Sequence, residues 1–377
     1  KVIAINPNYS YAYNNYGIAL NGLHKYQEAE NFFIHAMRIE PNYYDANVNY
    51  GNSLFRNDIF DKAIYYYERS LEIRPGENYI FGDILHAKMQ ICNWKDWSNS
   101  IKKLTEDISK EKKIIGPFAL TALIDNPGLI RKATEIFIND KFPKNSSLPE
   151  ISKVPKHSKI RIGYFSADFR DHPVSALTIE LYENHCRNKF EVYAFSYGPD
   201  TNDPMNLRIK SAVDHFYDIR SMSNIDSAIL VRSLELDIAV DLGGFTQDAR
   251  TEIFSISIAP IQLSYIGYLG TMGASYYDYL IADLVIIPEK DQKSYTEKIV
   301  YLPTFQVNDS NQTETVTSLS RKDVGLPEKG FVFCCFNKSY KYNPRCFDIW
   351  ARILNKVQNS VLLIYAENNL AQSNLKN

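Results

Sequence analysis

The hydrophobic and polar positions at the start of the chain repeat every 34 residues. Pro7, Pro41 and Pro75 follow this interval, and so do the matching segments 12–17 and 46–51. Proline ends a helix, and small residues allow two helices to approach closely. Each period therefore predicts a pair of packed helices followed by a turn. Two complete pairs are expected, over residues 12–41 and 46–75.

A period of 34 residues with this placement of small and aromatic residues is the signature of the tetratricopeptide repeat (TPR). Gly17 and Ala29 are expected at the close approach of paired helices, and Tyr26 and Phe60 between neighbouring pairs. Such arrays bind extended polypeptides, so the repeats predict a protein or peptide partner. They usually need at least about three repeats. Because residues 1–7 resemble the tail of an earlier repeat, we expect further repeats upstream.

Residues 79–157 are interpreted as a helical connector and linker. Apolar residues recur at helical spacing up to about residue 142, and a polar segment with prolines follows over 143–157. The residue types at 92–97 and 117–120 indicate no chemistry. We interpret these two segments as packing between the repeats and the domain that follows.

From residue 158 the pattern changes to short apolar runs that alternate with helical segments. Strands are predicted over 160–165, 191–197, 236–242, 262–266, 279–282 and 299–301. This alternation predicts a doubly wound, parallel sheet of the Rossmann type over residues 158–325. A second unit of the same kind begins at residue 326, with strands at 331–336 and 360–365 around a helix at 343–356. Two strands cannot close such a sheet, so the unit 326–377 is expected to be truncated.

Polar and glycine residues gather where the predicted strands end. They are Asp168, His172, Gly243, Gly244, Thr246, Gly267 and Gly270. A glycine after a strand usually forms a turn, so each residue alone is ordinary. Open parallel sheets bind ligands beyond the carboxyl ends of their strands. The same character at four strand ends therefore predicts a binding site.

Composition narrows the choice of partners. The 377 residues carry a net charge of −2 and are 45% hydrophobic and 23% charged, which is ordinary for a globular protein and excludes a polyanion such as nucleic acid. No stretch approaches the roughly 18 apolar residues of a membrane helix. The five cysteines form no CxxC pair, and their odd number argues against a disulfide framework. A cytoplasmic protein is expected.

Several ordered motifs resemble the O-GlcNAc transferase/SPINDLY family, in particular its bacterial members. They comprise residues 160–169, 172–175, 241–246, 249–250, 259–262, 267–271 and 336–337 together with Lys341. The resemblance implies a GT-B fold of two Rossmann-like domains. It implies transfer of N-acetylglucosamine (GlcNAc) from UDP-GlcNAc to serine or threonine hydroxyls of proteins, with inversion and without metal or cofactor. No Asp-x-Asp motif is present, which agrees.

The resemblance also implies roles for individual residues. His172 matches the active-site histidine, which would accept the proton of the acceptor hydroxyl directly or through water; alternatively, it caps the following helix. Asp168 either orients its neighbours or forms a strand-end turn. Thr246 and Gly267 match positions that line the sugar pocket. Lys341 matches the lysine that neutralises the leaving diphosphate, although a loop lysine is usually a surface charge.

Four positions depart from the pattern of the family: Ala176 and Asp237 replace histidines, Leu269 a proline, and Lys338 a glutamine that contacts the nucleotide base. Lys338 would favour an added phosphate contact, which leaves GDP-fucose, used by the SPINDLY branch, as an alternative donor. Arg250 is interpreted as structural.

Two further alternatives are a TPR interaction scaffold with a vestigial or incomplete transferase and a transferase acting on glycans or lipids. The nucleotide motif expected further downstream is absent. Weak or no activity is therefore expected from residues 1–377 alone.

Overall fold

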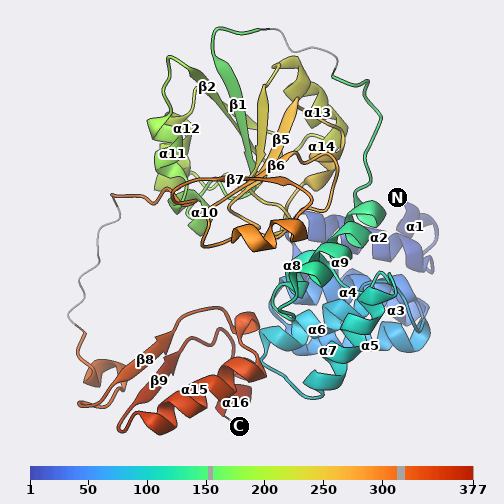
Figure 1. The fold of residues 1–377 in the computed structure, drawn as a ribbon. Coiled ribbons are helices and arrows are strands. Elements are labelled where there is room, and N and C mark those ends of the chain that lie inside the picture. Colours follow the sequence, from blue (N-terminus) through green and yellow to red (C-terminus); the bar gives the residue numbers. More distant parts are fainter. Residues whose placement is uncertain (152–155, 312–318, 377) are drawn as a thin grey trace. The chain divides into compact units, whose positions relative to one another are not determined.

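The computed structural model describes residues 1–151, 156–311 and 319–376. These residues form two compact units (Figure 1). Residues 1–124 and the C-terminal segment make up the first, and residues 125–311 make up the second. No helix in this described part of the chain is long and apolar enough to cross a membrane.

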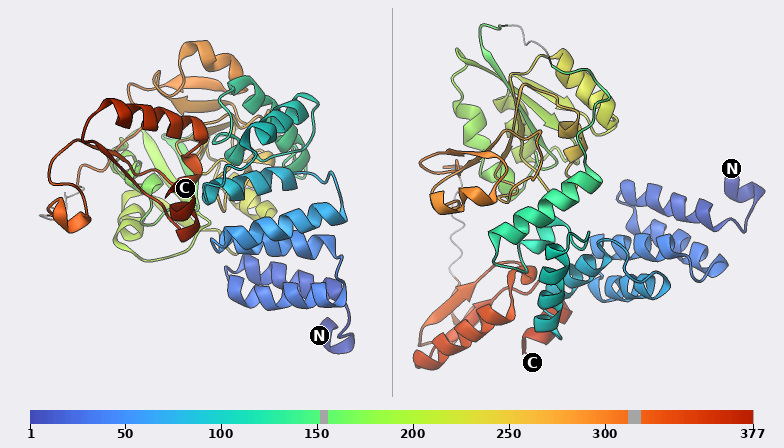
Figure 2. Two further views of the ribbon diagram at one scale, coloured as in Figure 1. Left: turned by 90° about the horizontal axis from the view of Figure 1, so that it is seen from below. Right: turned by 45° about the vertical axis from the view of Figure 1, so that its right-hand side comes forward.

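The first unit begins with the predicted helical pairs. After the short α1 (Val2–Ile5), the first pair is α2 (Ser10–Gly22) and α3 (Tyr26–Ile39), and the second is α4 (Tyr44–Arg56) and α5 (Phe60–Ile73). The pairs are stacked side by side, as Figure 2 shows from two further sides. The prediction of two complete repeats is confirmed.

The period of 34 has a direct origin in packing. A Cβ atom added to Gly17 would lie 2.7 Å from the ring of Phe33, and one added to Gly51 would lie 2.7 Å from the ring of Tyr67. Gly51 follows Gly17 by 34 residues, and Tyr67 follows Phe33 by the same interval. Ala29 is fully buried, so the expected close approach of the paired helices is confirmed.

The predicted connector is divided between the two units. Helices α6 (Ile80–Gln90), α7 (Trp97–Ser109) and α8 (Pro117–Leu120) continue the first unit, whereas α9 (Pro127–Lys141) belongs to the second. Helix α6 packs on α5 and also on a short 3-10 turn, η3 (Ser339–Lys341). The connector therefore packs on the repeats through α6.

The C-terminal segment forms the expected strand–helix–strand unit. Strands β8 (Val332–Cys335) and β9 (Val361–Ile364) are parallel neighbours, and α15 (Pro344–Lys356) connects them. Three elements of this segment were not predicted from the sequence: the turns η2 (Lys322–Val324) and η3, and the helix α16 (Asn369–Lys376).

The second unit is a parallel sheet of seven strands in the order β3-β2-β1-β4-β5-β6-β7. Their bounds are β1 Ile160–Ser166, β2 Phe190–Ser196, β3 His215–Asp218, β4 Ile238–Asp241, β5 Ile261–Tyr265, β6 Tyr279–Ala282 and β7 Lys298–Tyr301. Six were predicted, and β3 was missed. Because β3 is a four-residue strand at the edge of the sheet and is only partly buried, it lacks the apolar run that marks the others.

Helices cover both faces of this sheet (Figure 1). On one face, α11 (Ile179–Asn184) and α12 (Pro204–Ala212) bury side chains such as Tyr182 against Tyr164 and its neighbours. On the other, α14 (Thr251–Ser255) places Phe254 against Phe165, beside α13 (Asn224–Ser233). The remaining helical elements are α10 (Pro173–Ala176) and the 3-10 turn η1 (Glu289–Ser294). The doubly wound prediction is confirmed.

Candidate active site

Four of the six residues predicted for the site lie in loops at one edge of the second unit's sheet. Strands β1, β4 and β5 are neighbours and run parallel, so their carboxyl ends lie together. Asp168 and His172 follow β1, Thr246 follows β4, and Gly267 follows β5. The arrangement is the one expected for a ligand site of an open parallel sheet.

His172 caps the helix that follows it. Its Nδ1 atom accepts a hydrogen bond from the backbone N–H of Val174 at 3.3 Å, at the start of α10. The same Nδ1 lies 3.6 Å from Oδ2 of Asp168, and a third of the imidazole side chain is exposed. The helix-capping interpretation is thus confirmed. It does not exclude catalysis, because the cap fixes the orientation of a ring that remains open to solvent.

The carboxylate of Asp168 lies between two nitrogen-bearing side chains. Oδ1 accepts a hydrogen bond from Nη2 of Arg170 at 3.3 Å, and Oδ2 faces His172. The backbone of Asp168 is held as well, since its N–H donates to Oγ of Ser166 at 2.9 Å and its carbonyl accepts from the hydroxyl of Ser175. Asp168 is therefore a strand-end turn residue, and its role in orienting neighbouring groups stays a prediction.

The glycine turn after β4 depends on a buried carboxylate that the sequence did not single out. Asp241 is 2% exposed, and its Oδ1 accepts from the backbone N–H groups of Gly243 at 2.9 Å and Gly244 at 3.1 Å. Burial raises the pKa of Asp241, whereas these donors and the hydroxyl of Tyr277 favour its charged form. The signal available in the sequence was an aspartate at the end of an apolar strand.

The same turn places Thr246. Gly244 has φ +58°, a left-handed conformation that favours glycine, and an added Cβ atom would lie 2.5 Å from Cβ of Tyr268. The Thr246 hydroxyl donates to the carbonyl of Gly243 at 2.8 Å, and the side chain is partly exposed. The lining of a sugar pocket by Thr246 stays a prediction.

Gly267 is required by a close approach of two loops. A Cβ atom at this position would lie 2.0 Å from the carbonyl oxygen of Leu242, after β4. The preceding residue, Ile266, has φ +62°, which is strongly disfavoured for a β-branched side chain. Backbone strain of this kind concentrates at functional sites, where the surrounding structure maintains it. Packing accounts for the glycine, and its contact with a sugar stays a prediction.

The two predicted donor lysines lie in the other unit. Lys338 and Lys341 follow β8, and Nζ of Lys338 forms an ion pair with Glu367, after β9, at 3.2 Å. The phosphate contact of Lys338 stays a prediction, and this ion pair already engages part of its ammonium. Lys341 is exposed, and its Nζ lies 6.0 Å from the ring centroid of Tyr340. Both lysines follow the carboxyl end of β8, and parallel sheets bind ligands beyond such ends.

The structure explains one departure from the family pattern, Asp237, and the structural interpretation of Arg250. Asp237 precedes β4 and accepts a hydrogen bond from the backbone N–H of Arg161 at 2.8 Å, so it lies at the opposite edge of the sheet from His172. The guanidinium of Arg250 donates to the carbonyls of Ile219 and Met222, each within 2.9 Å, which confirms its structural role.

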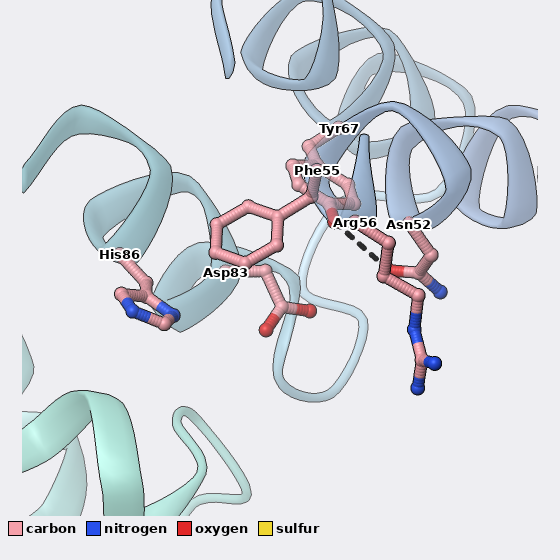
Figure 3. A pocket seen from close by; sticks show the side chains of 6 residues that line it. All are labelled: Asn52, Phe55, Arg56, Tyr67, Asp83 and His86. Atoms are coloured by element: carbon pink, nitrogen blue, oxygen red, sulfur yellow. Dashed lines mark hydrogen bonds between the residues drawn. The ribbon is translucent and has the colours of Figure 1, made fainter. Parts of the chain in front are cut away.

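A pocket of about 290 Å³ lies between α4 and α5 of the second repeat and α6 of the connector (Figure 3). Its lining residues are Asn52, Phe55, Arg56, Tyr67, Asp83 and His86. Tyr67 donates to Oδ1 of Asn52 at 2.9 Å, and the ring of Phe55 packs 4.9 Å from that of His86. Aromatic, amide and charged groups therefore share one small cavity.

Comparison with known proteins identifies the family. The sequence profile of glycosyl transferase family 41 matches residues 144–316 and 308–376, more than half of the chain, and a tetratricopeptide repeat profile matches residues 1–31. The chain belongs to glycosyl transferase family 41.

Relatives with assigned names support this membership. The probable UDP-N-acetylglucosamine–peptide N-acetylglucosaminyltransferase SEC of Arabidopsis thaliana is 32% identical over 301 residues, which cover 74% of this chain and 31% of the relative. The UDP-N-acetylglucosamine–peptide N-acetylglucosaminyltransferase of Caenorhabditis elegans is 31% identical over 242 residues. These residues cover 59% of this chain and 21% of that relative. This family 41 chain thus spans about a third or less of the length of these relatives.

A solved structure agrees on the fold. A point mutant of the O-GlcNAc transferase of Thermobaculum terrenum matches with a TM-score of 0.76 and 21% identity, over 97% of this chain and 70% of its own. The expected fold class is confirmed: helical TPR repeats, a GT-B-type Rossmann-like domain and the start of a second one.

A partly buried histidine that lines the pocket predicts a pH-dependent stability of this family 41 chain. Burial lowers the pKa of His86 from its ordinary value of 6.5 to about 4. As the pH falls below 6.5, the unfolded chain binds a proton that the folded chain does not, so stability decreases. The loss should reach about 3 kcal/mol near pH 4 and vanish above about pH 7.5, where both states are neutral.

Denaturant unfolding followed by tryptophan fluorescence would measure this effect, because all three tryptophans lie in the first unit. His86→Phe keeps an aromatic ring and should remove about 3 kcal/mol of the acid-induced loss. His24→Phe, at an exposed position, is the matched control and should retain it. An unchanged pH dependence in His86→Phe would contradict the assignment.

Proposed function

We propose that this member of glycosyl transferase family 41 transfers GlcNAc from UDP-GlcNAc to serine or threonine hydroxyls of protein acceptors. The observation that carries the proposal is the His172–Asp168 pair at the carboxyl end of β1. The names of the relatives support the donor and the peptide acceptor. The transfer is proposed to proceed with inversion and without a metal or cofactor.

The pair offers a mechanism for deprotonating the acceptor. In the capping arrangement Nδ1 of His172 accepts from the N–H of Val174, so Nε2 of a neutral ring carries the proton. If Nδ1 is instead protonated and turns to Asp168, now 3.6 Å away, Nε2 carries the lone pair and can accept the hydroxyl proton. Asp168 would then stabilise the imidazolium that forms.

Charge on the leaving diphosphate is the second requirement of the reaction. We assign its neutralisation to Lys341, because a fixed cation at developing negative charge lowers the barrier without reorganisation. Lys338 has a smaller role, since its ammonium is already paired with Glu367. Thr246 and the turn around Gly267 are assigned to the sugar of the donor.

Acceptor proteins are assigned to the repeats. The pocket between α4, α5 and α6 presents side chains of both charges together with an aromatic ring, which suits a polypeptide segment better than a lipid or a glycan. This assignment favours the protein acceptor over the two other acceptor classes.

A panel of donors tests the proposal. The full-length protein, incubated with UDP-GlcNAc or GDP-fucose and a serine- and threonine-containing acceptor peptide, should release UDP and glycosylate the peptide. Release of nucleotide from GDP-fucose alone would instead identify an O-fucosyltransferase. Peptide binding to the repeats without turnover of either donor would identify an interaction scaffold. Either outcome overturns the proposal.

A further inference from the structure

The C-terminal segment fixes the end of helix α6. The last carbonyls of a helix have no partner within it. Here the side-chain amide of Asn368 donates to the carbonyl of Gln90 at 3.1 Å, and that of Asn374 donates to the carbonyl of Ile91 at 2.8 Å. Two side chains nearly 300 positions further along the chain therefore cap α6.

The turn η3, which carries the donor lysine, packs against the same helix. The buried thiol of Cys92, just after α6, donates to the carbonyl of Ser339 at 3.7 Å, and Ser339 is fully buried. The ring of the next residue, Tyr340, contacts His86 of α6 edge-on at 5.9 Å between centroids and Phe118 of α8 at 6.0 Å. Burial raises the pKa of Tyr340. Tyr340 is thus held by two helices of the connector.

Lys341 lies between two anchored tyrosines. Its ammonium lies 6.0 Å from the ring centroid of Tyr340, within reach of a cation–π contact. On the other side, Tyr342 is 1% exposed, and its hydroxyl donates to the carbonyl of Asn337 at 2.6 Å. The backbone of the turn is therefore held on both sides of Lys341, and the lysine ammonium lies near the ring of Tyr340.

The same contacts reach the pocket of the repeats. His86 packs on Phe55 at 4.9 Å, and both residues line that pocket (Figure 3). The rings of Phe55, His86 and Tyr340 form an unbroken series from the second TPR repeat to the turn η3.

We propose that Tyr340 is a positioning residue for Lys341, and that helices α6 and α8 of the connector set the geometry of the donor lysine. A lysine side chain has four rotatable bonds and loses conformational freedom when it is fixed. A ring already held by His86 and Phe118 removes part of this cost before the nucleotide binds. The inference rests on the proposed function, in that Lys341 meets the diphosphate.

The test compares Tyr340→Ala, Tyr340→Phe and Lys341→Ala in the full-length protein. UDP binding is measured by calorimetry, and KM is measured separately for UDP-GlcNAc and the acceptor peptide. Tyr340→Ala should weaken UDP binding and raise the donor KM about tenfold, with the acceptor KM within about twofold. Tyr340→Phe should behave as wild type, because the ring and not the hydroxyl makes the contacts.

Tyr66→Ala is the matched control, since it removes a partly buried ring that packs on Tyr50 in the repeats, and its donor KM should be unchanged. Tyr340→Leu, which keeps apolar bulk without an aromatic face, replaces the alanine variant if that variant unfolds. Weakened UDP binding in Lys341→Ala with normal binding in the Tyr340 variants would overturn the inference alone. Normal UDP binding in Lys341→Ala would overturn the assigned role of the lysine in the proposed function.

Discussion

Replacing His172 with alanine is expected to lower kcat for transfer about 10²- to 10³-fold, with the donor KM within about threefold of wild type. Proton transfer from the acceptor hydroxyl occurs only as the bond to the sugar forms, so the loss should fall on kcat. Steady-state kinetics with UDP-GlcNAc and an acceptor peptide would measure both constants.

Asp168→Asn separates orientation from proton transfer. An amide cannot stabilise the imidazolium, so kcat should fall about tenfold or more, and the acidic limb of the pH–rate profile should move to lower pH. His215→Ala is the matched control, because His215 also lies beside a carboxylate, that of Glu191, but on the edge strand β3. A kcat for His172→Ala within threefold of wild type would remove the histidine from the mechanism.

Lys341→Ala is expected to lower kcat/KM for UDP-GlcNAc about 10²- to 10³-fold, the range found when one group that stabilises developing charge is removed. The diphosphate gains negative charge as it leaves, so the ammonium stabilises the transition state more than the bound donor. Rates of UDP release with and without acceptor peptide would measure the effect on transfer and on donor hydrolysis.

Two other lysines provide the comparison. Lys338→Ala should cost less than about fivefold, because Lys338 is already paired with Glu367 and its ammonium is largely screened by solvent. Lys329→Ala changes an exposed lysine of the same segment and should have no effect. Activity that is unchanged in Lys341→Ala would refute the phosphate role, whatever the other two variants show.

The site could be predicted in part because the loops that follow neighbouring parallel strands all lie at the same edge of the sheet. Asp168, His172, Thr246 and Gly267 follow strands that the apolar runs mark clearly, so their common edge followed from the chain alone. Asp241 was missed because its importance depends on which N–H groups and which hydroxyl surround it. The double role of His172, as helix cap and as neighbour of Asp168, could be named from the sequence only as two alternatives.

The sequence by itself determined the repeats and most strands. Gly17 and Phe33 recur as Gly51 and Tyr67 because in each helical pair a glycine of the first helix packs against a ring of the second. Such contacts join residues that are close in sequence, so their period can be recognised in the sequence alone.

Only the tertiary structure decided which distant segments meet. The edge strand β3, the split of the connector between two units and the packing of Tyr340 on His86 all depend on partners far apart in sequence. The residue types of such a pair show that each can be buried, but not against what. The choice is made by shape and by the satisfaction of buried polar groups across the folded unit, as when Asn368 and Asn374 cap α6.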